Sequence, residues 1–129
     1  MDVFLTSDAK RDIEILRLTR PQTGTWGLIF GHNRGSRVYI ERLFPAGKNP
    51  PRNLSLLFSN IGKASARTPN GLFVFGSSSA IKKAVLGPAF CGKLFSEISP
   101  AGLEKRLKFH IVDFDGAFFL SPVRTAAGR

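Results

Sequence analysis

The strongest constraint on the fold lies near the C-terminal end, where two apolar segments flank the dipeptide Asp115-Gly116. The segments 107–114 and 117–120 are rich in β-branched and aromatic residues, as strands are. Asp-Gly favours the two-residue turn whose twist matches that of paired strands. These residues predict a β-hairpin, whose apolar face must pack against other elements.

A second hairpin is predicted in the first half of the chain. The segments 26–30 and 38–44 have the composition of strands, and the segment 32–36 between them contains the Asn and Gly that a tight turn requires. The first segment is nearly all apolar, which is typical of a strand buried on both faces, whereas the second alternates more, like a strand nearer an edge.

The remaining elements follow from apolar spacing and from chain breakers. Thr6 or Ser7 can cap a helix that continues to Arg20, where Pro21 stops it. From Asn53, apolar residues recur at i, i+3, i+4 and i+7, which predicts a second helix. The other expected elements are a strand at 72–75, a short helix at 80–86 and a further helix at 89–98.

The order helix, hairpin, helix, strand, helix, hairpin predicts an α+β domain, with one mixed β-sheet built from hairpins and helices packed on it. A chain of 129 residues with 43% hydrophobic residues is typical of a single globular domain. We therefore expect one domain over residues 1–129, with an ordered core at about 6–122 and a flexible tail at 123–129.

Charge limits the chemistry of the chain. Between Ile15 and Ser96 there are twelve Lys or Arg residues and one carboxylate, Glu41. Hydrolysis by paired carboxylates and binding of Mg²⁺ or Ca²⁺ both need acids that this stretch lacks. The formal net charge of +10 favours polyanions such as nucleic acid, although charge can also serve solubility alone.

The residues that bind metals are few. His32, Cys91 and His110 are the only Cys or His residues, and each is isolated in the sequence, so no zinc site and no cofactor are predicted. A single cysteine forbids an internal disulfide and fits a reducing cytoplasm. The N-terminus shows no secretory signal, and no apolar stretch is long enough to span a membrane.

A candidate anion site follows the strand at 72–75. Here a glycine and three serines precede a helix with two lysines, so backbone N–H groups, hydroxyls and ammonium groups could surround a phosphate. The alternative is that a serine only caps the helix. The predicted site consists of Gly76, Ser77, Ser78, Ser79, Lys82 and Lys83.

A candidate basic patch combines the first hairpin with the end of the second helix. If these elements are neighbours, their cations could contact a phosphate backbone. Binding of single strands would also need exposed aromatic rings, and in this hairpin only Tyr39 qualifies. A solvated charged face is the alternative. The patch consists of Arg34, Arg37, Arg42, Lys63 and Arg67.

The sequence also resembles the JAB/MPN (JAMM-like) domain. The resemblance rests on the element order, on the segments 25–31 and 70–76 with their glycines, and on Leu43-Phe44-Pro45. Active members of this family are zinc-dependent isopeptidases or related hydrolases. The resemblance places their Glu near 23–25, their His-x-His near 74–76 and their Asp between 81 and 95, and this chain lacks all of these residues.

The resemblance therefore implies a degenerate, non-catalytic member that serves as a protein-interaction or scaffold module. The alternative is a basic protein that binds nucleic acid or phosphate through the candidate anion site and the basic patch. We expect a protein partner under the first hypothesis and a nucleic acid or other polyanion under the second. An oligomer is compatible with both.

Overall fold

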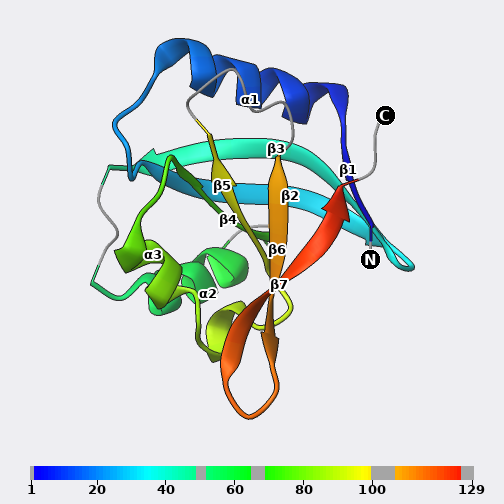
Figure 1. Ribbon diagram of the computed structural model, residues 1–129, viewed down its shortest axis with the longest axis vertical. Coiled ribbons are helices and arrows are strands. Elements are labelled where there is room, and N and C mark those ends of the chain that lie inside the picture. Colours follow the sequence, from blue (N-terminus) through cyan, green and yellow to red (C-terminus); the bar gives the residue numbers. More distant parts are fainter. Residues whose placement is uncertain (1, 49–51, 65–68, 100–106, 126–129) are drawn as a thin grey trace.

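The computed structural model describes residues 2–48, 52–64, 69–99 and 107–125, and the side chains of 61–64 are not among the described parts. Within these residues, seven strands form a closed barrel in the order β1-β3-β2-β4-β5-β6-β7 (Figure 1). The strands are β1 (Asp2–Leu5), β2 (Trp26–Arg34), β3 (Arg37–Gly47), β4 (Gly71–Phe75), β5 (Leu94–Ile98), β6 (Lys108–Phe114) and β7 (Phe118–Thr125).

The predicted fold class is wrong. The chain does not form an α+β, JAB/MPN-like domain with helices packed on a single mixed sheet, because its strands close on themselves as a mixed barrel. Closure depends on β1, which pairs in parallel with β3 on one side and with β7 on the other. β1 was missed in the sequence because four residues before a helix cap carry little strand signal on their own.

The helix predicted at the start of the chain is confirmed as α1 (Ser7–Thr19). The Thr6 hydroxyl accepts a hydrogen bond from the amide of Ala9 (3.2 Å), and Asp8 lies in the first turn, where the helix dipole favours negative charge. Arg20 ends the helix in the left-handed conformation, with φ of 47°. The helix buries Ala9, Ile13 and Leu16.

Two further helices and a short 3₁₀ segment lie on the other side of the barrel, away from α1 (Figure 1). They are α2 (Leu54–Ala64), α3 (Ser79–Ala84) and η1 (Pro88–Phe90). None of the helices that the structure describes is long and apolar enough to cross a membrane.

The core has two parts. One fills the barrel and includes the buried face of α1, with Ile29, Ile40 and Phe73 among its fully buried members. The other lies between the outer face of the sheet and the α2, α3 and η1 segments, and it includes Leu72 and Phe95. Because β4 lies between the two parts, all five of its residues are buried, which explains its continuous apolar sequence.

Several segment boundaries differ from the predictions. Residues 89–98 are not a helix: η1 ends at Phe90, and 94–98 form β5, parallel to β4. A strand buried on both faces loses its alternation, so its apolar residues can mimic helical spacing. At the C-terminal end, β7 extends to Thr125, so 123–125 belong to a strand rather than to the expected tail.

Candidate nucleic-acid interface

Three aromatic rings form a row on the outer face of β1, β3 and β2. Phe4 pairs in register with Tyr39, and Tyr39 pairs with His32. The Phe4 and Tyr39 ring centroids are 5.1 Å apart with an interplanar angle of 16°, and those of Tyr39 and His32 are 5.2 Å apart with an angle of 14°. We call these three side chains the aromatic row.

The aromatic row faces solvent because strand residues alternate between faces. The preceding residues Val3 and Val38 point into the barrel and are buried. Phe4 and Tyr39 are partly buried by their neighbours, while His32 at the end of the row is exposed. The helices α2 and α3 pack against another part of the sheet, which contains β4, β5 and the first residues of β2 (Trp26 and Leu28).

Two arginines lie beside the aromatic row. Arg34 and Arg37 are paired in register next to the turn of the β2–β3 hairpin, and both are exposed. The Arg37 guanidinium lies 5.7 Å from the centroid of the Phe4 ring, in a cation–π arrangement. Neither arginine forms an ion pair with any residue that the structure describes, so both can bind an external anion.

The carboxylates near the row already have partners within the fold. The Glu41 carboxylate lies 3.2 Å from Nδ1 of His32, which orients the imidazole ring in the row. Asp2 accepts two hydrogen bonds from Arg124. These bonds are the main reason that the pKa of Asp2 is lowered, and the positive charge of Arg37 contributes further. Asp2 therefore stays ionised and balances Arg124.

Of the predicted basic patch, the structure describes the side chains of Arg34, Arg37 and Arg42. Arg34 and Arg37 lie together, but Arg42 donates hydrogen bonds to Asp12 on α1 (2.9 and 3.4 Å). That contact raises the pKa of Arg42, whose guanidinium also lies 5.0 Å from the centroid of the Phe44 ring. The side chain of Lys63 and all of Arg67 lie outside the described residues.

Three of the six residues of the predicted anion site make contacts within the fold. The Ser78 hydroxyl caps α3 by accepting a hydrogen bond from the amide of Ile81 (3.3 Å), and the amide of Gly76 donates to the carbonyl of Ile98. Lys82 lies 3.8 Å from the Glu97 carboxylate. Ser78 therefore caps α3 as the alternative expected, while anion binding by Ser77, Ser79 and Lys83 stays a prediction.

No group of three or more His, Cys, Asp or Glu side chains that could hold a metal ion occurs among the described residues. His32 belongs to the aromatic row. His110 lies on β6, where burial is the main reason that its pKa is lowered. Cys91 is exposed.

Two members of the aromatic row could not be found from the sequence. Tyr39 was expected to be the hairpin's only exposed ring, His32 was placed in a turn, and Phe4 lies in the strand that was missed. For His32 alone the sequence carries a usable signal. His32 and Tyr39 lie at equal distances from the turn that contains Gly35, so they become cross-strand neighbours if both strands continue to that turn.

Comparison with known proteins provides information on the fold only. No family model and no curated protein matches the chain. Among solved structures, the chain is similar to protein DSY2949 from Desulfitobacterium hafniense, with 15% identity and a TM-score of 0.59. The similarity covers 99% of this chain and 94% of that one. None of these comparisons tests the JAB/MPN resemblance, which stays a prediction.

Proposed function

We propose that this protein binds single-stranded nucleic acid on the outer face of β1, β3 and β2. The observation that carries the proposal is the aromatic row, flanked by Arg34 and Arg37, on a chain with a net charge of +10. Proteins that bind single strands without strong sequence preference combine stacking rings with cations that follow the backbone.

The chemistry assigns a role to each part of this surface. A base can stack on the exposed end of the row at His32, while Tyr39 and Phe4 support that ring from behind. Arg34 and Arg37 lie at the turn, where they can contact the phosphates of the same strand. Base stacking on an aromatic ring contributes roughly 1–3 kcal/mol per base, and phosphate contacts add a salt-dependent attraction.

Single strands fit this surface better than duplexes do. Rings stack only on bases whose faces are accessible, and a duplex hides those faces. A cytoplasmic location is part of the proposal, since single-stranded nucleic acid occurs there and an exposed lone cysteine is compatible with a reducing compartment.

The test is fluorescence anisotropy with a labelled, mixed-sequence single strand, in both DNA and RNA form, at low salt. We expect His32→Ala and Tyr39→Leu each to weaken binding about fivefold or more, the lower end of the stacking range. Phe119→Ala is the matched control, because it removes a partly exposed ring on β7 that is not part of the row.

Two results would overturn the proposal. The first is no binding of either strand at low salt by the folded protein. The second is that His32→Ala and Tyr39→Leu bind like the unmodified protein, because binding would then depend on charge alone. Circular dichroism of each variant confirms that it is folded.

A non-catalytic role in protein interaction is the second candidate function, and a specific observation favours it. The β6–β7 hairpin carries exposed phenylalanines away from the aromatic row, with Phe114 at 54% exposure. Exposed apolar side chains that cluster on one part of the surface are typical of protein–protein interfaces.

A further inference from the structure

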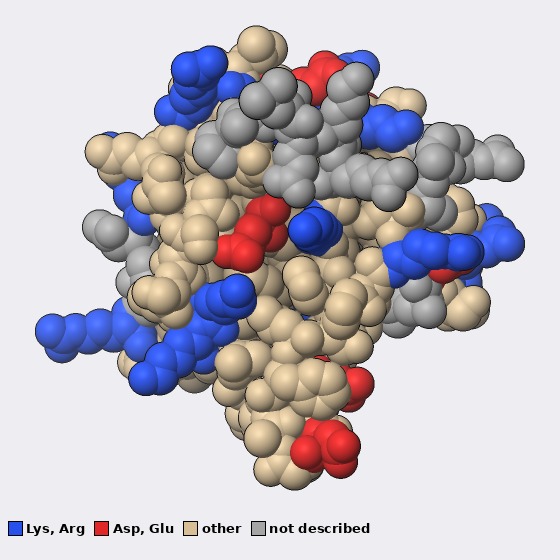
Figure 2. All heavy atoms as spheres, in the orientation of Figure 1, with Lys and Arg blue, Asp and Glu red and all other residues tan. Residues whose placement is uncertain are grey.

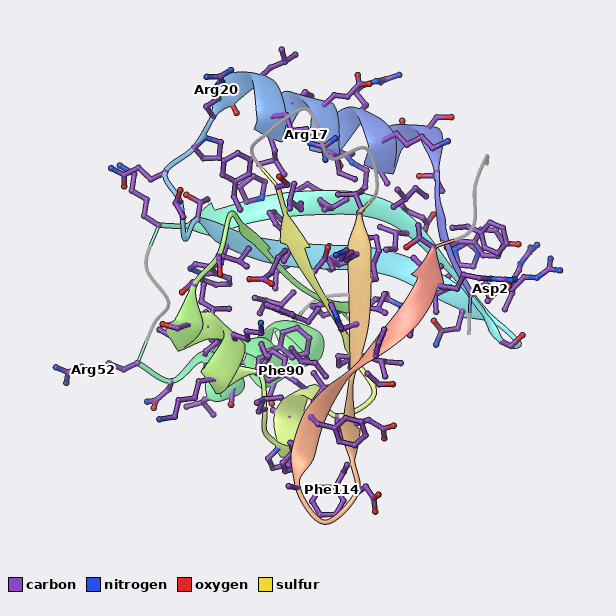
Figure 3. All side chains as sticks on the ribbon, viewed as in Figure 1. Asp2, Arg17, Arg20, Arg52, Phe90 and Phe114 are labelled. Atoms are coloured by element: carbon purple, nitrogen blue, oxygen red, sulfur yellow. The ribbon has the colours of Figure 1, made fainter. Side chains whose placement is uncertain are left out.

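The β6–β7 hairpin projects from the body of the protein (Figure 1). Phe114 lies at its tip (Figure 3), and its ring packs edge-on against Phe118 with centroids 4.9 Å apart. Phe119 pairs with Asp113 on the opposite face of the hairpin and is 43% exposed. Both faces of the tip therefore present aromatic surface to solvent.

The charge of the hairpin tip is opposite to that of the whole chain. Between Lys108 and Arg124 there is no Lys or Arg, and the tip carries Asp113 and Asp115. Figure 2 shows acidic side chains at the end of the projection and basic side chains over the body. A nucleic acid or an anionic membrane would be repelled by this tip, so its partner must be basic and apolar.

A second copy of the chain offers a surface of that kind. A groove of about 700 Å³ lies between the start of α2 and α3. Ala80 and Ala84 of α3 line it together with Leu56 of α2 and with Arg52, whose side chain projects outward from the body (Figure 3). The volume lies within the range of about 300–1,000 Å³ that is usual for ligand pockets.

The groove is complementary to the hairpin tip in charge, and part of its lining is apolar. No residue that lines it is acidic, and Lys83 follows on α3. Leu56 is 59% exposed, and the nearby Leu57 and Leu86 are each 37% exposed. The small side chains of Ala80 and Ala84 leave room for an aromatic ring.

We propose that two copies of this chain bind each other by exchanging hairpins, with Phe114 of each copy in the groove of the other. Asp113 and Asp115 then approach Arg52 and Lys83 of the second copy. An exchange about a twofold axis uses both hairpins and both grooves, so the assembly closes at two copies. The aromatic row lies on other strands, so this proposal does not depend on the proposed function.

Sedimentation velocity over a wide concentration range tests the proposal. We expect a dimer that dissociates on dilution, and Phe114→Ser should weaken dimerisation about tenfold or more, as expected for an anchoring aromatic residue. Asp8→Lys with Arg11→Glu, an exposed pair on α1, is a control that should leave the dimer unchanged.

A charge-exchange experiment identifies the two surfaces. One variant carries Asp113→Lys and Asp115→Lys, and the other carries Arg52→Glu and Lys83→Glu. Each alone should be monomeric because its hairpin and groove have the same charge sign, whereas an equimolar mixture should form a dimer. A monomer at every concentration, a dimer that resists these changes, or no dimer on mixing would overturn the proposal.

Discussion

Asp2 and Arg124 are 122 positions apart in the chain, yet their side chains form two hydrogen bonds at the seam of the barrel. Arg124 donates through Nε to Oδ1 (3.1 Å) and through Nη2 to Oδ2 (3.0 Å). Among the described residues the backbone pairing at this seam is short, with Asp2 opposite Arg124 and Val3 opposite Thr125. The Asp2–Arg124 contact therefore supports the pairing of β1 with β7, where the barrel closes.

We expect Arg124→Gln to loosen this seam. The amides of β1 and β7 should exchange hydrogen with solvent faster, because the variant loses the ion pair that accompanies a short stretch of paired backbone. Hydrogen exchange followed by mass spectrometry measures this change. Arg11→Gln is the control, since Arg11 and Asp8 are exposed neighbours 3.9 Å apart on α1. Equal exchange in both variants would contradict the expectation.

We expect the free energy of unfolding to fall at acidic pH because of His110. Burial, assisted by the nearby charge of Lys82, lowers the pKa of His110, and its Nδ1 is buried without a partner among the described residues. Below about pH 6.5 the unfolded chain binds a proton that the folded protein accepts only at lower pH, so the free energy of unfolding decreases. Urea denaturation at pH values above and below about 6.5 measures the slope of the free energy of unfolding against pH.

His110→Gln should reduce that slope. His32→Gln is the matched control, because it leaves His110 in place and should retain the loss of stability on acidification. If the His110 variant and the unmodified protein have the same slope, the buried imidazole is not its source.

We expect Gly27→Ala to destabilise the barrel strongly. An added Cβ at Gly27 would contact the Phe44 carbonyl oxygen and the ring of Phe73, neither of which can move without disturbing the sheet. Overpacking of this kind costs about 1–3 kcal/mol or more. Gly87→Ala, where the structure leaves open space, should change the free energy of unfolding by less than about 0.5 kcal/mol. Similar melting curves for the two variants would contradict this account.

We expect Thr25→Val to stabilise the protein. Thr25 is 6% exposed, and its hydroxyl has no hydrogen-bond partner among the described residues. Replacing that hydroxyl with a methyl group removes the desolvation cost and should add about 1 kcal/mol to the free energy of unfolding. Thr6→Val should instead lose about 1 kcal/mol, because Thr6 caps α1. A loss of stability in both variants would show that the Thr25 hydroxyl is satisfied.

We expect the salt dependence of nucleic-acid binding to identify the arginines involved. Arg34→Gln and Arg37→Gln should each reduce the slope of log K against log salt by about 1, the effect of one lost phosphate contact. Lys83→Gln is a charge-matched control on α3 and should leave the slope unchanged. An equal reduction in all three variants would indicate attraction to net charge without a defined interface.

Local elements were largely predictable from the sequence. Thr6 and Pro21 bound the first helix, Gly35 and Gly116 mark the two hairpin turns, and β4 is apolar throughout. Each of these signals acts within a few residues: a cap bonds an amide in the next turn, and a turn glycine adopts positive φ. Such interactions do not depend on what packs against them.

The barrel and the aromatic row were decided only by tertiary structure. β5 is a strand because β4 and β6 pair with it, and β1 exists because β3 and β7 do. Phe4 and His32 reach Tyr39 only across those pairings. Which distant segments pair depends on the free energy of the whole packed sheet, and this information is not contained in the spacing of neighbouring residues.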